Sequence, residues 1–430
     1  MAVTEALGVG MLGCGTVGTA VLRLLHEHAE DVLRRTGGPI KVVRVAVRDP
    51  ARDRDVPVGA ERFANDPMEV VRAEDVRIVV ELMGGIEPAR SAILEALRLG
   101  KRVVTANKEL LATHGPELFE AAAAPGAGLH FEAAVAGGIP LIRPLIESLP
   151  GERLTRLLGI VNGTTNFVLT RMTEDGSSFE DALAEAQRLG YAERDPSDDL
   201  DGFDAAAKCA ILASLAFDTR VVLEDVYREG ISGVSPEDIE FARRLGYVVK
   251  PLAVAELEDG EVAVRVHPAM VPENHPLAAV REAFNAVFVS GPNVGELMFY
   301  GRGAGGAPTA VAVVGDLVTA ARLAAEGRPG VTFPSERRRG IRSMERMESQ
   351  YYLLLDVADR PGVLAQVAGA FGKHRVSIRS VWQEGRGEEA LLVLITHRAI
   401  EGDLRRTVED LRSLDVVVEV RSLMRVEGEE

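Results

Sequence analysis

Short apolar runs alternate with amphipathic segments along the first third of the chain. The runs that have the length of buried strands are residues 7–12, 41–47, 78–82, 102–105 and 129–133. Between them, apolar residues recur with helical spacing over residues 19–34, 88–99 and 117–123. Strands that alternate with helices at this interval predict a parallel, doubly wound sheet of the Rossmann type.

The pattern changes after Gly138. Helices are expected at residues 142–148 and 203–215, and strands at residues 154–161, 263–266 and 286–290. These elements predict a second, mixed α/β domain for substrate binding and dimerisation. A glycine-rich turn at residues 301–306 then precedes an apolar helix at 308–325, which we expect to return to the first domain.

The last part of the chain has its own order of elements. Residues 328–349 are polar, contain prolines and a basic run, and are typical of a linker. Beyond them, a strand, helix, strand, strand, helix and strand are expected at residues 351–357, 362–373, 377–383, 390–396, 401–414 and 416–426. This βαββαβ order indicates a ferredoxin-like domain. The predicted division is therefore residues 1–137 (completed by about 302–326), 138–301, a linker at 327–349, and 350–430.

Composition narrows the class of protein. A chain of 430 residues with 47% hydrophobic and 5% aromatic content fits an α/β protein with an aliphatic core. A net charge of −16 argues against a nucleic-acid partner. The two cysteines, Cys14 and Cys209, exclude a disulfide framework and a Cys/His metal motif. No leader and no run of about 18 apolar residues is evident, so we expect a cytoplasmic protein without a membrane partner.

A glycine fingerprint lies directly between the first strand and the first helix. Gly13 permits a tight turn, Gly15 lets the backbone approach a pyrophosphate, and Gly18 allows the helix to pack closely on the strand. The helix N-terminus supplies donors for phosphates. In this context the motif predicts a dinucleotide site, although a glycine-rich turn that binds nothing is the alternative.

The end of the second strand decides between the two nicotinamide cofactors. An acidic residue there binds the ribose 2′-hydroxyl, whereas an arginine accommodates a 2′-phosphate. Arg48 occupies this position, so NADP(H) is preferred over NAD(H). Asp49 follows directly and could still face a ribose.

The most informative stretch is residues 190–208. It places six carboxylates between Glu193 and Asp204, and Lys208 follows one helical turn after the last of them. On a helix, Asp204 and Lys208 share one face. A polar loop with a surface ion pair is one interpretation. A site that holds an ammonium group and moves a proton with a lysine is the other.

These motifs together resemble the homoserine dehydrogenase family over roughly residues 8–325. The stretches that carry the resemblance are the glycine fingerprint and residues 105–108, 132–140, 162–166 and 190–208. The tail, with residues 359–364 at a strand-to-helix turn, resembles an ACT regulatory domain. No aspartate kinase segment precedes the fingerprint, so a monofunctional form is expected.

The resemblance implies reversible, NAD(P)H-dependent reduction of L-aspartate 4-semialdehyde to L-homoserine, in threonine, methionine and isoleucine biosynthesis. It implies that Lys208 is the proton donor and acceptor and that Lys108 lies close to the nicotinamide and the substrate. The implied substrate-binding residues are Glu193, Asp199 and Asp204. Those that line the cofactor, beside the three glycines and Lys108, are Thr16, Val17, Arg48, Thr105, Gly190 and Gly305.

The family also implies a monovalent cation (Na⁺ or K⁺) held largely by backbone carbonyls at Glu132, Val135, Gly137 and Ile139. L-Threonine is the expected effector of the tail, and a homodimer or homotetramer the expected assembly. The alternatives are a surface role for Lys108, a Glu132 carboxylate satisfied by backbone N–H groups, and a tail that only dimerises.

Two other functions remain as alternatives. An aldehyde dehydrogenase of the semialdehyde type needs a cysteine nucleophile, but Cys14 lies in the phosphate turn and Cys209 in a core helix. A non-catalytic sensor of nucleotide and amino acid would lack a proton donor, whereas Lys208 is present.

Overall fold

The computed structural model describes residues 6–328, 338–385 and 389–428. Residues 1–5 and residues 329–337 of the predicted linker lie outside the described residues. The chain forms two compact units. Unit 1 comprises Met1–Leu157, Ala207–Val226 and Asn285–Arg339, and unit 2 comprises Leu158–Ala206, Tyr227–Phe284 and Gly340–Glu430.

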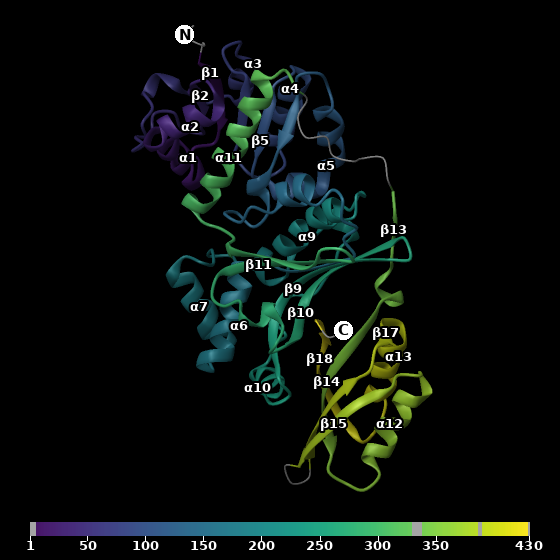
Figure 1. Ribbon diagram of the computed structural model, residues 1–430. Helices are drawn as coiled ribbons and strands as arrows, with labels where there is room; N and C mark the ends of the chain where they lie inside the picture. Colours follow the sequence, from purple (N-terminus) through teal and green to yellow (C-terminus); the bar gives the residue numbers. More distant parts are fainter. Residues whose placement is uncertain (1–5, 329–337, 386–388, 429–430) are drawn as a thin grey trace. The chain divides into compact units, whose positions relative to one another are not determined.

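Unit 1 contains a parallel sheet with the strand order β3-β2-β1-β4-β5-β6 (Figure 1). Its strands are β1 (Leu7–Leu12), β2 (Ile40–Ala46), β3 (Phe63–Ala64), β4 (Ile78–Glu81), β5 (Arg102–Thr105) and β6 (Gly128–His130). The order reverses direction at β1, which is the arrangement of a doubly wound nucleotide-binding sheet. The predicted Rossmann-type fold is thus confirmed.

The helices of this sheet differ from the prediction in three places, one of which is a helix at Pro67–Arg72 that was not predicted. They are α1 (Thr16–Glu27), α2 (Ala29–Thr36), α3 (Pro67–Arg72), α4 (Ala89–Arg98), α5 (Lys108–Ala122) and α11 (Gly306–Ala325). The helix expected at 19–34 is interrupted at His28, which leaves helical geometry with φ −111° and ψ 27°. The helix expected at 117–123 begins at Lys108 instead, because the Asn107 side chain accepts a hydrogen bond from Leu110 N–H and caps it.

The helix α11 returns to the nucleotide-binding sheet, as expected. By length and composition alone it could cross a membrane. However, Ala310, Val313, Leu317 and Ala320 are completely buried in the same core cluster as Val9 of β1. The helix therefore has the packing of a core helix. Unit 1 also contains η1 (Ala60–Arg62), η2 (Glu132–Ala134), the π-helical turn η3 (Pro144–Ser148), η4 (Leu223–Asp225) and β12 (Gly295–Arg302). The strand β11 (Phe284–Gly291) pairs with β12 and belongs to unit 1 from Asn285 on.

Unit 2 begins with a mixed α/β part. Its elements are α6 (Gly163–Asp175), α7 (Phe179–Leu189), α8 (Ser197–Leu200), β8 (Tyr227–Arg228), α10 (Pro236–Arg244), β9 (Tyr247–Glu258), β10 (Glu261–Pro272) and η5 (Pro276–Ala279). The strand β7 (Arg156–Ile160) and the helix α9 (Phe203–Ala216) each start in one unit and end in the other. The long antiparallel pair β9 and β10 extends well beyond the strand predicted at 263–266.

The carboxy-terminal domain has the predicted βαββαβ order. It consists of β14 (Glu348–Ala358), α12 (Val363–Lys373), β15 (Ile378–Gly385), β16 (Glu389–Thr396), α13 (Glu401–Arg412) and β18 (Val417–Val426), with the short β13 (Gly340–Ile341), η6 (Met344–Arg346) and β17 (Ala399–Ile400). The strand order β18-β14-β16-β15 is antiparallel throughout. This is a ferredoxin-like sheet, as the sequence predicted.

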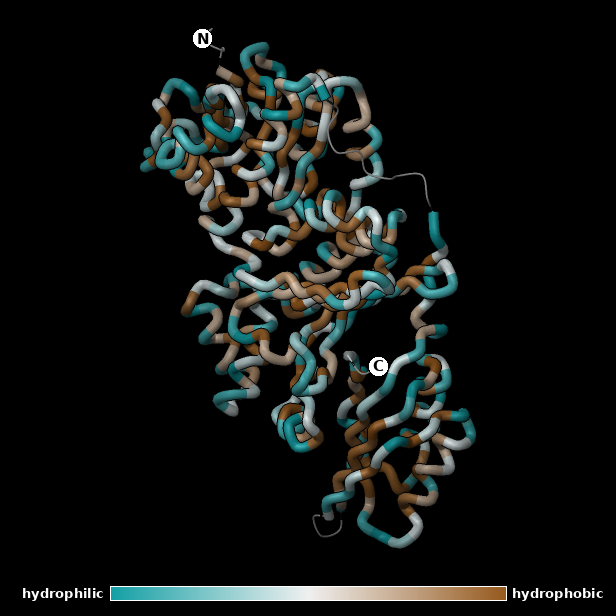
Figure 2. Tube along the Cα trace, viewed as in Figure 1, coloured by the Kyte–Doolittle hydropathy of each residue, from teal (hydrophilic) through white to brown (hydrophobic). Residues whose placement is uncertain are grey.

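Both faces of β14 are buried along its central part, which explains the unbroken apolar run at residues 351–355. Tyr351 and Leu353 pack with the helices α12 and α13, whereas Tyr352 and Leu354 join the core cluster of Phe167 in α6. Figure 2 shows the hydrophobic strands of this domain. Moreover, β18 pairs in parallel with β10, with Ala269 opposite Arg425. The carboxy-terminal domain therefore continues the sheet of the mixed α/β part.

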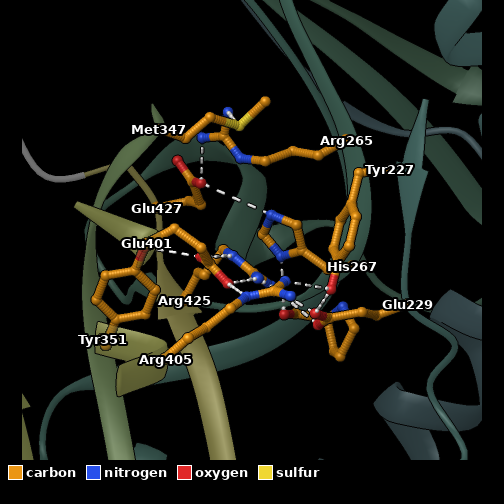
Figure 3. A network of polar contacts seen from close by, with 11 residues as sticks. Tyr227, Glu229, Arg265, His267, Met347, Tyr351, Glu401, Arg405, Arg425 and Glu427 are labelled. Carbon is orange, nitrogen blue, oxygen red and sulfur yellow. Dashed lines mark hydrogen bonds and ion pairs between the residues drawn. The ribbon is translucent and has the colours of Figure 1, made fainter. Parts of the chain in front are cut away.

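A cluster of buried charges lies where β10 and β18 meet (Figure 3). Arg425 donates to both carboxylate oxygens of Glu229 (2.9 and 3.2 Å) and both of Glu401 (3.1 and 2.8 Å). Arg265 donates to Glu427 (2.6 Å) and Glu256 (2.7 Å). We call this cluster the arginine network, and its other members are Tyr227, His267, Met347, Tyr351 and Arg405.

Candidate active site

The glycine fingerprint forms the turn between β1 and α1. Gly13 has φ +100°, and a Cβ atom there would lie 2.7 Å from the Leu82 carbonyl oxygen. A Cβ atom on Gly18 would lie 2.7 Å from the Gly13 carbonyl oxygen, so the helix packs directly on the turn. Gly15 differs, because a Cβ atom there would meet nothing within 4 Å. The turn is therefore closed on the protein side and open at Gly15, as a phosphate-binding turn requires.

The N-terminus of α11 lies beside this turn. Gly305 has φ +116°, and a Cβ atom on the next residue, Gly306, would lie 2.9 Å from the Thr16 methyl carbon. Val17, next to Thr16, is half-buried. The predicted cofactor residues Thr16, Val17 and Gly305 are thus brought together with the fingerprint. Two helix N-termini contribute positive potential at one place, which suits the diphosphate of a dinucleotide.

Arg48 is exposed just after β2. Its neighbour Asp49 accepts a hydrogen bond from Ala51 N–H (3.0 Å) and so fixes the turn that follows the strand. The Asp49 carbonyl oxygen also accepts from Arg54 (2.9 Å). Of the two residues that the sequence left open, Asp49 has a structural role in its own turn.

A buried polar network fixes the loops after β4 and β5. Glu81 is fully buried, and its carboxylate accepts from Met83 N–H (2.7 Å) and from the Thr105 hydroxyl (2.7 Å). The Thr105 hydroxyl oxygen accepts from Asn107 N–H (3.0 Å). Lys108 follows as the first residue of α5 and is half-buried. The network thus holds the predicted cofactor residue Thr105 and the start of the Lys108 helix in one arrangement.

The carboxylate of Glu132 serves as a buried cap. It is 1% exposed and accepts from the N–H groups of Leu141 (2.5 Å), Ile142 (2.8 Å) and Arg143 (2.9 Å). The Glu132 N–H in turn donates to Asp316 (2.7 Å). Burial, and then the nearby Glu132 charge, raise the pKa of Asp316 to about 7. The side chain of Glu132 therefore has the backbone partners that the alternative interpretation expected.

The other predicted cation ligands form a buried turn beside Glu132. Val135, Gly137 and Ile139 are buried, and the backbone between them bends through positive φ angles at Ala136 (+57°) and Gly137 (+45°). In the described residues, no three His, Cys, Asp or Glu side chains gather as metal ligands. The chemistry of this turn thus fits only a cation that backbone carbonyls can hold, and the cation itself stays a prediction.

Asn162 joins two carboxylates of the acidic stretch in unit 2. Its amide nitrogen donates to Asp199 (2.6 Å) and to Asp204 (2.8 Å). Asn162 is 4% exposed and Asp204 is 9% exposed. Thr164 also binds this stretch, because its hydroxyl donates a hydrogen bond to the Tyr191 carbonyl oxygen (2.7 Å). Two of the three predicted substrate carboxylates are therefore brought to one point.

The helix α9 carries Asp204 and Lys208 one turn apart, as predicted. Each of these side chains is 9% exposed, so neither belongs to a solvated surface ion pair. Glu193 and Gly190 lie on the exposed loop after α7, where Gly190 has φ +78°. The Asn162 amide thus joins Asp199 and Asp204, whereas the Glu193 carbonyl oxygen accepts from the Gln187 amide (3.1 Å).

Four residues of these sites were not predicted from the sequence, namely Glu81, Asn107, Asn162 and Asp316. A signal existed for two of them, since Asn107 and Asn162 each stand directly before a helix in the N-cap position. Glu81 ends an otherwise apolar strand, where a buried charge needs partners. Nothing in the sequence pairs Asp316 with Glu132.

Comparisons with known proteins now decide the family. Residues 140–318 match homoserine dehydrogenase, residues 13–132 match the homoserine dehydrogenase NAD binding domain, and residues 351–416 match the ACT domain. A homoserine dehydrogenase of Corynebacterium glutamicum is 48% identical over 98% of this chain and 96% of its own length. The chain belongs to the homoserine dehydrogenase family. It is therefore an NAD(P)-dependent oxidoreductase.

Solved homoserine dehydrogenases have the same fold. The crystal structure of the enzyme from Thiobacillus denitrificans superimposes with a TM-score of 0.93 at 42% identity, and the match covers 99% of both chains. A hyperthermophilic archaeal homoserine dehydrogenase in complex with NADPH has a TM-score of 0.63 at 29% identity and matches 74% of this chain and 98% of its own. The fold class predicted from the sequence, with its Rossmann-type, mixed and ACT parts, is thus confirmed.

Proposed function

We propose that this homoserine dehydrogenase interconverts L-aspartate 4-semialdehyde and L-homoserine, with NADP(H) preferred over NAD(H) and with Lys208 as proton donor and acceptor. The observation that carries this proposal is the pairing of Asp199 and Asp204 on one amide, with Lys208 one turn along the same helix as Asp204. Carboxylates suit the ammonium group of an amino acid, and a buried lysine suits a reacting oxygen.

When bound, the nicotinamide supplies or accepts the hydride, and the protein supplies orientation and a proton. In the reductive direction, negative charge develops on the aldehyde oxygen as its carbon becomes a CH–OH carbon. Lys208 gives a proton to this oxygen, and its ammonium charge stabilises the oxyanion beforehand. In the oxidative direction, neutral Lys208 takes the hydroxyl proton. Asp199, Asp204 and Glu193 hold the substrate ammonium, and Lys108 contacts the cofactor and the substrate.

Three features support NADP(H). Arg48 is exposed at the end of β2, where a guanidinium can pair with a 2′-phosphate. Asp49 is engaged in its own turn through Ala51. A related archaeal homoserine dehydrogenase was solved in complex with NADPH. The fingerprint, Thr105, Gly190 and Gly305 complete the proposed cofactor site.

We further propose a Na⁺ or K⁺ ion at the backbone turn of Val135, Gly137 and Ile139, beside Glu132. The assembly that we propose is a homodimer or homotetramer. We propose that residues 1–137, completed by about 302–326, bind the cofactor. Residues 138–301 bind the substrate and form the dimer, and residues 350–430 are regulatory.

The effector proposed for the carboxy-terminal domain is L-threonine. The turn before α12 contains Gly362 with φ +92°, so a small carboxylate can approach the helix N-terminus. Within unit 2, contacts lead from this domain to the acidic stretch. Arg425 binds Glu229, and two residues further on Ile231 N–H donates to the Leu200 carbonyl oxygen (3.0 Å). Leu200 directly follows Asp199, so a shift of β18 would be transmitted to the proposed substrate carboxylate of Asp199.

A paired assay tests the catalytic proposal. Wild-type enzyme should reduce NADP in the presence of L-homoserine faster than it reduces NAD, and alkylation of its thiols should not abolish this activity. Lys208→Ala should lower kcat by about 10²–10⁴-fold while the KM for NADP changes little. Lys41→Ala, which removes an exposed lysine on β2, is the matched control and should keep wild-type activity. A Lys208→Ala enzyme that keeps more than about a third of wild-type kcat, far above that range, would assign the proton to Lys108 or to water.

A further inference from the structure

A short turn connects the two carboxylates that the Asn162 amide joins. Asp199 lies in α8, and Asp204 lies in the first turn of α9. Between them, the Gly202 N–H donates to the Asp199 carbonyl oxygen (3.1 Å), and Gly202 has φ +81°. We call residues 200–203 the connecting turn. Because this turn is short and joins both helices, its position determines where the two carboxylates lie.

The connecting turn packs against the segment that contains β8. The Ile231 N–H donates to the Leu200 carbonyl oxygen (3.0 Å). The guanidinium carbon of Arg228 lies 3.5 Å from the centroid of the Phe203 ring. A Cβ atom on Gly230 would lie only 2.5 Å from the Leu200 carbonyl oxygen. The two backbones can therefore approach this closely only because residue 230 has no side chain.

Residues 227–231, which we call the β8 segment, are held more firmly than the connecting turn. The strand β8 pairs in parallel with β10, and the Glu229 N–H donates to the Val266 carbonyl oxygen (2.7 Å). In addition, the Glu229 carboxylate accepts two hydrogen bonds from Arg425 of the arginine network (Figure 3). Phe203 of the connecting turn is instead 38% exposed. A methyl group added at residue 230 would thus displace the turn rather than the segment.

We propose that the β8 segment positions the substrate carboxylate of Asp199, with Gly230 as the positioning residue; this inference rests on the function proposed above. The absence of a side chain at Gly230 lets the connecting turn lie against the segment, and this contact determines where Asp199 presents its carboxylate. Gly230 acts only through the turn. Its replacement should therefore weaken the binding of homoserine and leave the KM for NADP unchanged.

A pair of matched glycine variants tests this role in the full-length enzyme. Gly230→Ala should raise the KM for L-homoserine by about tenfold or more, because overpacking a close backbone contact displaces the turn. Gly233→Ala is the control, since a Cβ atom there would meet nothing within 4 Å, and it should leave both KM values unchanged. Neither glycine has a positive φ, so a difference between the two variants reports the close contact alone.

A second variant decides the question if Gly230→Ala proves unstable in a thermal melt. Arg228→Met removes the guanidinium from the Phe203 ring, and it should fold because Arg228 is exposed. A cation–π contact at an exposed site contributes little, so the KM for homoserine should rise only about two- to fivefold.

The positioning role is wrong if Gly230→Ala folds and keeps the wild-type KM for homoserine, if Gly233→Ala shows the same defect, or if the KM for NADP rises equally. If Gly230→Ala does not fold, an unchanged KM for homoserine in Arg228→Met overturns the role. Asp199→Asn, assayed alongside, separates this role from the proposed function. A raised KM for homoserine in Asp199→Asn, with a wild-type KM in Gly230→Ala, refutes the positioning role alone. A wild-type enzyme that does not oxidise homoserine refutes both.

Discussion

Replacing Arg425 by methionine tests how firmly the arginine network joins β18 to the strands beside it. The Arg425 side chain is 4% exposed and donates four hydrogen bonds to Glu229 and Glu401. Methionine fills a similar volume but donates none. Removing one partner of a buried ion pair leaves an uncompensated charge, which costs about 3–5 kcal/mol of the free energy of unfolding.

The two glutamates contribute unequally to this loss. Burial would raise the pKa of Glu401, but the charge and hydrogen bonds of Arg425 outweigh burial and lower this pKa below its ordinary value. The Glu401 side chain is 1% exposed, whereas that of Glu229 is 35% exposed and can be hydrated. Without Arg425, Glu401 keeps only weaker support from the Tyr351 hydroxyl (2.8 Å) and Arg405 (3.0 Å) among the contacts described above. Most of the expected loss therefore arises at Glu401.

Trp382 gives a local readout, because it is the single tryptophan of the chain and lies on β15. Urea unfolding followed by its fluorescence reports on the carboxy-terminal domain, and far-ultraviolet circular dichroism reports on the whole chain. The matched control is Arg405→Met, because Arg405 binds the same Glu401 but is 45% exposed. An exposed pair contributes about 0.2–1 kcal/mol, so this variant should lose far less stability.

The reasoning would be refuted if both variants lost the same stability, or if Arg425→Met lost less than about 1 kcal/mol. Glu401→Gln completes a double-mutant cycle with Arg425→Met. Because the two residues are in contact, their losses should be non-additive by about 0.5–3 kcal/mol. Strict additivity would mean that the observed hydrogen bonds do not couple the two side chains.

Three further outcomes are expected. Arg48→Ala should raise the KM for NADP sharply and leave that for NAD nearly unchanged, and equal effects in steady-state kinetics would exclude contact with the 2′-phosphate. Burial, and then the charges of Arg425 and Arg265, lower the pKa of His267 to about 3. As the pH falls below about 6.5, the ordinary pKa of histidine, the unfolded chain therefore takes up a proton that the folded chain does not. The free energy of unfolding should fall by up to about 1.4 kcal/mol for each pH unit below about 6.5. His267→Gln should flatten this slope in urea titrations at pH 6 and 5, and an unchanged slope would contradict a buried neutral histidine. L-Threonine at millimolar concentration should slow the wild-type enzyme and raise its melting temperature. Gly362→Asp puts a carboxylate at the N-terminus of α12 and should abolish both effects. A wild-type enzyme whose rate and melting temperature do not change with threonine contradicts the effector proposal.

The parts of the fold that the sequence predicted well are those where one local signal suffices. The strands β1, β4 and β5 are short and buried on both faces, and their central residues are apolar, as a doubly covered parallel sheet requires. The turn at Gly13 needs a positive φ, which glycine adopts without steric strain, so the residue type predicts this turn. The order of strands and helices in the carboxy-terminal domain was predicted equally well, because each of them has the expected length.

The elements that the sequence did not reveal depend on contacts between distant residues. The helix α5 includes Pro116, which obscured its first half, although the Asn107 cap starts it at Lys108. The helix α6 was not predicted at all, since its N-terminal residues are polar and buried rather than amphipathic. Its cap, Asn162, meets Asp199 and Asp204 across separations of 37 and 42 residues. No spacing rule could have grouped these three side chains.

Two groups of carboxylates show how the donor decides what a cluster contributes. Arg425 brings a positive charge to Glu229 and Glu401 and so stabilises the fold. Asn162 orients Asp199 and Asp204 with a neutral amide and adds no charge of its own. The type of donor, rather than the number of acids, therefore distinguishes the two clusters.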